Sequence, residues 1–208
     1  MDEIINAALA TACPERNLTW LDVGCGRGDL LRKVRDEWQP AALCGVDPIE
    51  WLDADLKADV TFLTESIEEA DSLPVSDRVM LVEVIEHLEA PWLALRRAAR
   101  LVAPGGRIVV STPNLASLRN RLELALRGGL ASFRIDHLPH VSPALPHVIA
   151  RILSEEGLAV DSPRFAGADV ISLTRGRVWP ERMRSRLPKL TSVSLIVSAA
   201  RALEDDLE

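Results

Sequence analysis

The sequence predicts an α/β fold in which helices cover both faces of a mostly parallel sheet. An apolar run over residues 18–23 is typical of a buried strand, and residues 28–38 place leucine and valine at helical spacing. Three glycines lie between the two patterns. A strand, a glycine turn and a helix in this order form the first unit of a nucleotide-binding sheet. Further apolar runs alternate with helical patterns along the chain, as in a doubly wound fold.

The composition is that of an ordinary globular protein, with 208 residues of which 48% are hydrophobic and 26% charged. This length predicts a single domain, residues 1–208. The net charge of −7 argues against a general nucleic-acid binder. Three cysteines without a Cys-x-x-Cys pair indicate a reducing compartment and no disulfide framework. The sequence shows neither a basic leader nor an apolar run that could span a bilayer, so we expect a cytoplasmic protein.

The first half of the chain alternates predicted helices and strands. Residues 2–12 repeat apolar side chains at helical spacing, which predicts an amphipathic helix that ends before Pro14. Short apolar runs at 42–47 and 59–63 predict the second and third strands. The continuous apolar run at 78–82 predicts a fourth strand that is covered on both faces.

The second half begins with a helix that Pro91 opens and that extends to residue 101. A turn over 102–106 precedes the fifth strand at 107–112. Residues 115–126 carry leucines at helical spacing, and two glycines stop this helix. Residues 161–187 show few periodic features. The remaining predicted elements are a helix over 143–156 and strands over 158–160 and 192–200.

The glycine turn carries the first chemical signal. Gly24, Gly26 and Gly28 let the backbone bend sharply and let a ligand approach without a Cβ in the way. The helix that follows presents free N–H groups, which favour an anionic group. The dinucleotide fingerprint Gly-x-Gly-x-x-Gly fails here, because Asp29 occupies its third position. This mismatch, together with Asp22 before the loop, argues against an oxidoreductase that binds a dinucleotide.

Residues 21–29, Leu-Asp-Val-Gly-Cys-Gly-Arg-Gly-Asp, resemble the first motif of class I S-adenosylmethionine-dependent methyltransferases. Residues 103–109, Ala-Pro-Gly-Gly-Arg-Ile-Val, resemble the helix-to-strand signature of the same family, so the resemblance covers residues 18–114. It implies a Rossmann-like sheet of seven mostly parallel strands with an antiparallel last strand. It also implies a small lid over the substrate after the fifth strand, at residues 113–145.

The resemblance assigns cofactor contacts to several positions. The loop from Gly24 through Cys25 and Gly26 to Gly28 is expected to wrap the methionine and ribose part, and Asp22 to hold the amino acid end. Asp47 ends the second strand 23 residues after Gly24, near the spacing of a ribose-binding acid. The remaining expected contacts are Pro48 beside Asp47, Ser66 and Ile67 beside the adenine, and Glu83. Two alternatives stay open, since Asp47 with Pro48 can simply start a turn and Ser66 with Glu69 can cap a helix.

Histidines are the candidates for a general base, because a hydroxyl acceptor must lose a proton. His87 directly follows the fourth strand, where it can act as a base, contact substrate or cap local backbone. His137 and His140 lie in the irregular segment predicted to cover the site. His147 lies in a predicted helix and is expected to be structural.

A metal site is the competing interpretation of the same region. On a helical turn, Glu83, Glu86 and His87 share one face. With His140, or with His137 and its neighbour Asp136, they resemble the metal-ligand pattern of small-RNA 3′-terminal ribose 2′-O-methyltransferases. The run Glu-Val-Ile-Glu-His also occurs in methyltransferases of small molecules and polysaccharides. The segment after His140 resembles the corresponding segment of those enzymes more than that of the RNA-end enzymes. We therefore predict no metal, with Glu83 facing the cofactor.

The charges are unevenly distributed. Residues 113–189 hold twelve arginines and lysines against seven acids. Within them, the stretch 175–189 carries Arg175, Arg177, Arg182, Arg184, Arg186 and Lys189. This stretch is either a solvated surface or attracts an anionic partner: a nucleotide sugar, a phospholipid surface or an RNA end.

Taken together, the sequence predicts an S-adenosylmethionine-dependent methyltransferase that methylates an oxygen of a small-molecule, sugar-linked or lipid-linked acceptor. The alternatives are the metal-dependent enzyme acting on an RNA end and a module that binds the cofactor without catalysis. The acceptor itself does not follow from the fold.

Overall fold

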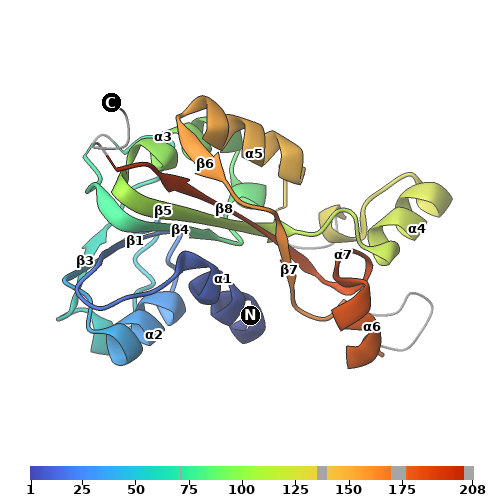
Figure 1. The fold of residues 1–208 in the computed structure, drawn as a ribbon, viewed down its shortest axis with the longest axis horizontal. Helices are drawn as coiled ribbons and strands as arrows, with labels where there is room; N and C mark the ends of the chain where they lie inside the picture. The colour runs from blue at the N-terminus through green and yellow to red at the C-terminus, as the bar shows by residue number, and fades with distance from the viewer. Residues whose placement is uncertain (71, 135–139, 170–176, 204–208) are drawn as a thin grey trace.

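The computed structural model describes residues 1–70, 72–134, 140–169 and 177–203. Its centre is a mixed sheet in the order β3-β2-β1-β4-β5-β8-β6, with the short strand β7 paired to β8 (Figure 1). The strands are β1 (Thr19–Val23), β2 (Ala42–Val46), β3 (Val60–Leu63), β4 (Ser76–Val82), β5 (Val102–Pro113), β6 (Leu158–Val160), β7 (Arg164–Ala166) and β8 (Ser194–Arg201).

The first five strands run parallel, whereas β8 runs antiparallel to β5, β6 and β7. The predicted path of seven strands with an antiparallel last strand is confirmed. The additional strand, β7, lies in the stretch whose pattern predicted no element. Its three residues are too few for a recognisable alternation.

Two pairs of helices cover the two faces of the sheet. α1 (Asp2–Ala12) and α2 (Asp29–Trp38) pack on one face, around a core that contains Trp20, Leu31 and Met80. α3 (Pro91–Arg100) and α5 (Pro146–Glu155) pack on the other face, around Leu81 and Ile108. Figure 1 shows these layers below and above the sheet. No helix in the described part of the chain is long and apolar enough to cross a bilayer.

Two local predictions were wrong. The turn over 102–106 is instead the start of β5, which pairs with β4 through a register shift between Ser76 and Arg78. The alternative in which Ser66 caps a helix also fails, because residues 67–69 form a turn and no helix follows; the Ser66 Oγ accepts a hydrogen bond from the Glu68 N–H within this turn. Pro91 and Pro146 do begin helices, where a missing N–H costs nothing.

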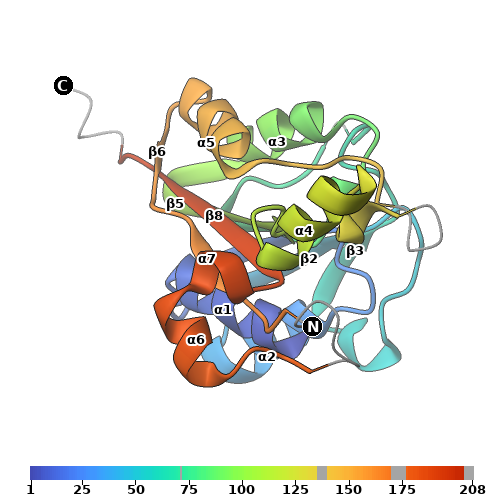
Figure 2. The ribbon, with the colours of Figure 1, turned by 90° about the vertical axis from the view of Figure 1, so that its right-hand side faces the viewer.

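The segment after β5 gathers at the end of the sheet where the parallel strands finish. It includes α4 (Leu118–Arg127) and the short helix η3 (Ala131–Phe133), and α6 (Glu181–Arg186) and α7 (Pro188–Thr191) lie at the same end (Figure 2). The predicted lid over 113–145 spans α4 and η3, and its residues 135–139 lie outside the described chain.

Asn114 anchors this segment to the sheet. Its buried Nδ2 group donates hydrogen bonds of 2.9 Å to the carbonyl oxygens of Lys189 and Ser192, and its Oδ1 accepts from the Ala116 N–H at 3.1 Å. The Asn120 amide in turn donates to the Asn114 carbonyl at 2.9 Å. One side chain therefore fixes both the start of α4 and the end of α7.

Asn114→Ala is expected to lower the free energy of unfolding by about 2–3 kcal/mol, because buried carbonyl groups lose their donors. Urea denaturation measures this change. Asn6→Ala, at an exposed amide on α1 that accepts from Lys33, is the matched control and should stay within about 0.5 kcal/mol. A decrease of less than about 1 kcal/mol in the free energy of unfolding of Asn114→Ala would show that these hydrogen bonds are dispensable for stability.

Candidate active site

The glycine loop forms the carboxyl end of β1. Gly24 and Gly26 have φ values of 68° and 51°, a region that side chains disfavour. A Cβ on Gly24 would come within 2.6 Å of a Val84 methyl group, whereas a Cβ on Gly26 would meet nothing within 4 Å. Gly24 is therefore required by packing as well as by its conformation. Gly26 borders open space.

Asp47 ties this loop to the end of β2. Its Oδ2 accepts a hydrogen bond of 3.0 Å from the Gly26 N–H, and its Oδ1 accepts one of 3.0 Å from the Ile49 N–H. The second bond makes the local turn that Asp47 and Pro48 predict. The first bond reaches a loop that lies 21 residues away, so the carboxylate also shapes the candidate site.

A cavity of about 210 Å³ opens beside the loop. It brings together five residues predicted to contact a cofactor: Asp22, Gly24, Cys25, Gly26 and Glu83. Gly28, Asp47, Pro48, Ser66 and Ile67 do not line it. Sequence reasoning missed the lining residues Met1, Ile5, Arg27, Asp29, Leu30 and Val82. Of these, Ile5 belongs to the predicted apolar face of α1, but such a pattern predicts packing and does not identify a ligand.

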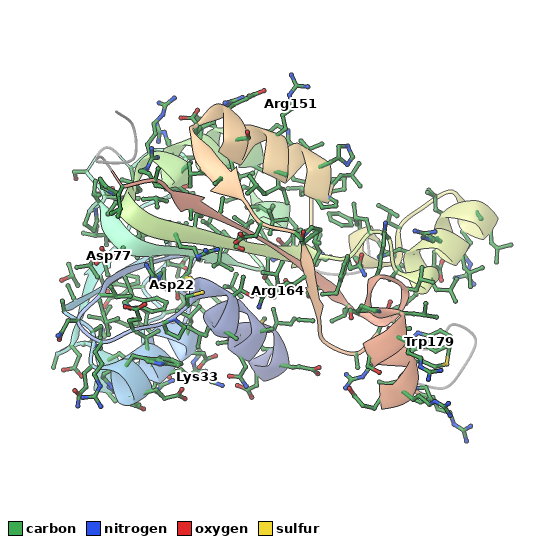
Figure 3. All side chains as sticks on the ribbon, in the orientation of Figure 1. Asp22, Lys33, Asp77, Arg151, Arg164 and Trp179 are labelled. Carbon is green, nitrogen blue, oxygen red and sulfur yellow. The ribbon has the colours of Figure 1, made fainter. Side chains whose placement is uncertain are left out.

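Buried carboxyl groups give this cavity its chemistry. Asp22, on the face of the sheet covered by α1 and α2, is almost fully buried (Figure 3). Its burial and the nearby charge of Asp47 raise the pKa of Asp22 to about 8. Burial also raises the pKa of Glu83, whose Oε1 accepts a hydrogen bond of 2.8 Å from the Ser111 hydroxyl. A cationic ligand that neutralises these carboxylates is therefore favoured here.

Glu83 also has an unusual backbone. Its φ of 56° lies in the left-handed region that non-glycine residues rarely adopt, and such strain concentrates at functional sites. The short helix η2 (Ile85–His87) begins two residues later. The conditional prediction that Glu83 shares a helical face with Glu86 and His87 is therefore wrong, because Glu83 lies before the turn and bonds to Ser111.

The loop after β3 is separate from this cavity. Ser66 makes a local turn, and Ile67 is buried in the core that α3 covers. The Ile67 carbonyl oxygen accepts a hydrogen bond of 3.2 Å from Arg97. A contact of Ser66 or Ile67 with an adenine ring stays a prediction.

Two of the three candidate histidines, His87 and His140, lie in contact with each other. The ring centroids of His87 and His140 lie 4.7 Å apart in an edge-to-face arrangement. His140 Nδ1 lies 2.7 Å from the Ser132 carbonyl oxygen, which as an acceptor selects the tautomer with a proton on Nδ1. His137 lies outside the described residues. His147 is exposed on α5 and has no part in this arrangement.

Glu86 completes a cluster with these rings. Its side chain is fully buried, and neither carboxylate oxygen has a hydrogen-bond partner in the described chain. Burial and the charge of Glu83 raise the pKa of Glu86 to about 8. Donor atoms of Glu86, His87 and His140 all lie within 4.8 Å of one another.

Backbone contacts hold the two halves of the cluster together. The N–H groups of Val141 and Ser142 both donate to the Glu86 carbonyl oxygen, at 2.8 and 3.0 Å. The Ser142 hydroxyl donates to the Leu88 carbonyl oxygen at 2.6 Å. The segment that carries His140 is thus fixed against η2, although 54 residues separate Ser142 from Leu88.

Comparisons with known proteins point to one activity. A family described as a methyltransferase domain matches residues 1–162. The ubiquinone biosynthesis O-methyltransferase of Paracidovorax citrulli is 31% identical over 194 residues, which cover 88% of this chain and 76% of that protein. The Vibrio vulnificus protein of the same name is 34% identical over 105 residues, but the match covers only 43% of its length.

Solved structures share the fold. A SAM-dependent methyltransferase from Archaeoglobus fulgidus superposes with a TM-score of 0.64 at 21% identity, covering 95% of this chain and 93% of its own. The N-methyltransferase NodS of Bradyrhizobium japonicum, in complex with S-adenosyl-L-homocysteine, superposes with a TM-score of 0.59 at 14% identity, covering 95% and 83%.

The raised pKa of Asp22 predicts a pH-dependent stability of the protein without ligand. Between pH 4 and 8 the folded state keeps a proton that the unfolded chain releases, so the free energy of unfolding falls as the pH rises, by up to about 1.4 kcal/mol per pH unit. Asp22→Asn is expected to flatten this part of the curve. Urea denaturation from pH 4 to 9 measures it, with Glu37→Gln at an exposed position of α2 as control. Parallel curves for Asp22→Asn and wild type would contradict the assignment.

Proposed function

Because this chain belongs to the S-adenosylmethionine-dependent methyltransferases, we propose that it transfers the methyl group to an oxygen of a small-molecule, sugar-linked or lipid-linked acceptor. The observation that carries this proposal is the position of the two histidines. They lie at the carboxyl edge of the sheet, next to the end of β4, which Glu83 follows. Ligands of open α/β sheets bind at this edge.

The cavity beside the glycine loop fits the cofactor. Its buried carboxyls Asp22 and Glu83 suit the cationic groups of the cofactor, and Gly26 leaves room for the ligand to approach the backbone. The Asp47 carboxylate can accept hydrogen bonds from ribose hydroxyls, and its Oδ2 also accepts the hydrogen bond from the Gly26 N–H of the glycine loop. When bound, the cofactor supplies a methyl group on a sulfonium, which already contains the leaving group.

The remaining work of the protein is to orient the acceptor and to remove its proton. The His140 ring, held by Ser132 through Nδ1, keeps Nε2 as the acceptor nitrogen for a hydroxyl proton. His87 lies edge-to-face against this ring and restricts its orientation. The oxygen acceptor is further supported by the names of the relatives, which are O-methyltransferases.

Asp47→Ala is expected to weaken binding of S-adenosylmethionine by about 1.5–3 kcal/mol, roughly 10- to 150-fold, because charge-assisted hydrogen bonds are lost. Isothermal titration with the cofactor and with its demethylated product measures this change. Asp55→Ala, an exposed acid that pairs with Arg32, is the control and should leave binding unchanged. Equal affinities of wild type and Asp47→Ala would refute the ribose contact. Cofactor binding by wild type without methyl transfer to any acceptor class tested would favour the silent module.

A second candidate is a metal-dependent transfer to an acceptor with adjacent hydroxyls, such as the terminal ribose of a small RNA. One observation favours it: the buried Glu86 carboxylate has no hydrogen-bond partner in the described chain and lies with His87 and His140. A carboxylate with two imidazoles is a donor set that divalent transition metals accept. The donors therefore fit a metal, which when bound would hold the acceptor hydroxyls and lower their pKa.

The two candidates differ in their response to a chelator. Under the metal-dependent candidate, excess chelator abolishes methyl transfer and added divalent metal restores it. Glu86→Gln and His87→Ala should then lower metal affinity by at least about tenfold. His147→Ala, at an exposed histidine of α5, is the control for both variants. Full activity in excess chelator would remove the metal-dependent candidate and leave the histidine base.

A further inference from the structure

Three of the four leucines of α4 lie on the side of the helix away from its one buried residue. Leu118, Leu122 and Leu126 follow one another at intervals of four residues and therefore form one stripe. Leu118 is half-buried, but Leu122 and Leu126 are 38% and 77% exposed. The one buried residue of this helix is Asn120, on the opposite side. The last two leucines of this stripe are thus exposed on the surface of the helix.

Cationic side chains flank this stripe. Arg121 lies one residue before Leu122 and is exposed, and its Nε donates only to the Ala116 carbonyl oxygen among the described residues. Arg119 lies on the other flank, 3.8 Å from Asp169. Residues 115–134 hold four arginines against a single acid, Glu123. α4 is therefore an amphipathic helix with arginines on both sides of an exposed apolar stripe.

α6 and α7 also combine exposed apolar residues with exposed cations. Met183 and Leu187 are exposed large apolar residues, spaced one helical turn apart. Arg182, Arg186 and Lys189 are exposed and form no ion pair with the described residues. Among the described residues of α6 and α7, Arg184 does form ion pairs, with Glu3 and Glu181. Of the basic stretch that the sequence analysis singled out, Arg175 lies outside the described chain.

These helices lie at one end of the molecule. Figures 1 and 2 place α4, α6 and α7 where β5 leaves the sheet, and α4 contacts α7. This end is basic although the whole chain has a net charge of −7. We call the surface formed by α4, α6 and α7 the basic apolar face.

We propose that the basic apolar face docks onto an anionic lipid surface. Exposed leucines between arginines match the two layers of such a surface, because the apolar side chains enter the acyl region while the cations meet lipid phosphates. Long arginine side chains can keep their charge at the headgroups while their stems lie along apolar surface. A nucleic acid would use the cations but leaves the leucine stripe without a partner.

Docking also orients the enzyme. The face surrounds the carboxyl edge of the sheet, so contact with lipid would turn that edge toward the bilayer. A lipid-linked acceptor could then reach the histidine pair without crossing bulk water. This last consequence rests on the proposed function, whereas docking itself does not.

Vesicle flotation tests the proposal. The full chain is mixed with phosphatidylcholine vesicles, or with vesicles that contain roughly one third phosphatidylglycerol. Two double variants are compared with wild type: Leu122→Ser with Leu126→Ser, and Arg182→Ser with Arg186→Ser. All four side chains are exposed, so the variants should fold. The control pair is Val75→Ser with Arg151→Ser, exposed residues away from the face, of which Figure 3 labels Arg151 on α5.

Wild type and the control pair are expected to bind the anionic vesicles and not the neutral ones, with affinity that falls as salt is added. The affinity of the Leu122→Ser/Leu126→Ser variant for anionic vesicles should fall at least about tenfold, because its apolar carbons no longer enter the lipid. The affinity of the Arg182→Ser/Arg186→Ser variant for anionic vesicles should fall roughly twentyfold, since each cation near an anionic surface raises the affinity by about a factor of five.

Several results would overturn the proposal. Failure of wild type to bind anionic vesicles is one, and binding of the Leu122→Ser/Leu126→Ser variant as strong as that of wild type is another. Binding of a single-stranded RNA oligonucleotide that depends on the arginine pair alone would make the face a nucleic-acid surface. A wild-type dimer that the leucine pair dissociates in sedimentation would make it a contact between copies. Cofactor titration of the same samples keeps the tests apart, because its failure refutes the proposed function and leaves lipid docking standing.

Discussion

The burial of carboxyl groups at one edge of a parallel sheet is the constraint on which this structure depends. Asp22 is the penultimate residue of β1 and Glu83 follows β4, and parallel pairing of these two strands brings both acids to the same edge. Burial destabilises the charged form of each carboxyl group and thereby raises its pKa. A protein that only needed to fold would gain by replacing them. Their presence indicates an edge adapted to a cationic ligand, in keeping with the sulfonium cofactor of the family.

The glycine loop and Asp47 make this edge accessible. Gly24 permits close contact with Val84, and Gly26 leaves the cavity open. The hydrogen bond from Gly26 to Asp47 then fixes the loop relative to the neighbouring strand. The proposed ribose contact of Asp47 would therefore use a carboxylate that also holds the loop.

A second constraint acts across the site. The segment that carries His140 is tied to η2 by hydrogen bonds from Val141 and Ser142 to one carbonyl oxygen. This contact sets the distance between the two histidine rings and closes the cluster around Glu86. Asn114 similarly fixes α4 and α7 at the end of β5. The histidine cluster and the basic apolar face are thus fixed by a few hydrogen bonds, from backbone N–H groups at Val141 and Ser142 and from the Asn114 side chain.

The sequence by itself determined the first five strands with their intervening helices, the glycine loop and the acid at position 47. Each is encoded locally, by periodicity or by residues that only certain backbone conformations accept. The tertiary structure alone decided three features. These are the contact between His87 and His140, the lack of a hydrogen-bond partner for the Glu86 carboxylate among the described residues, and the side of α4 that faces solvent. The physical reason is that a repeat of apolar residues fixes which side chains share a face. What that face meets depends on segments that are distant in the chain, and here the leucine stripe of α4 meets none of them.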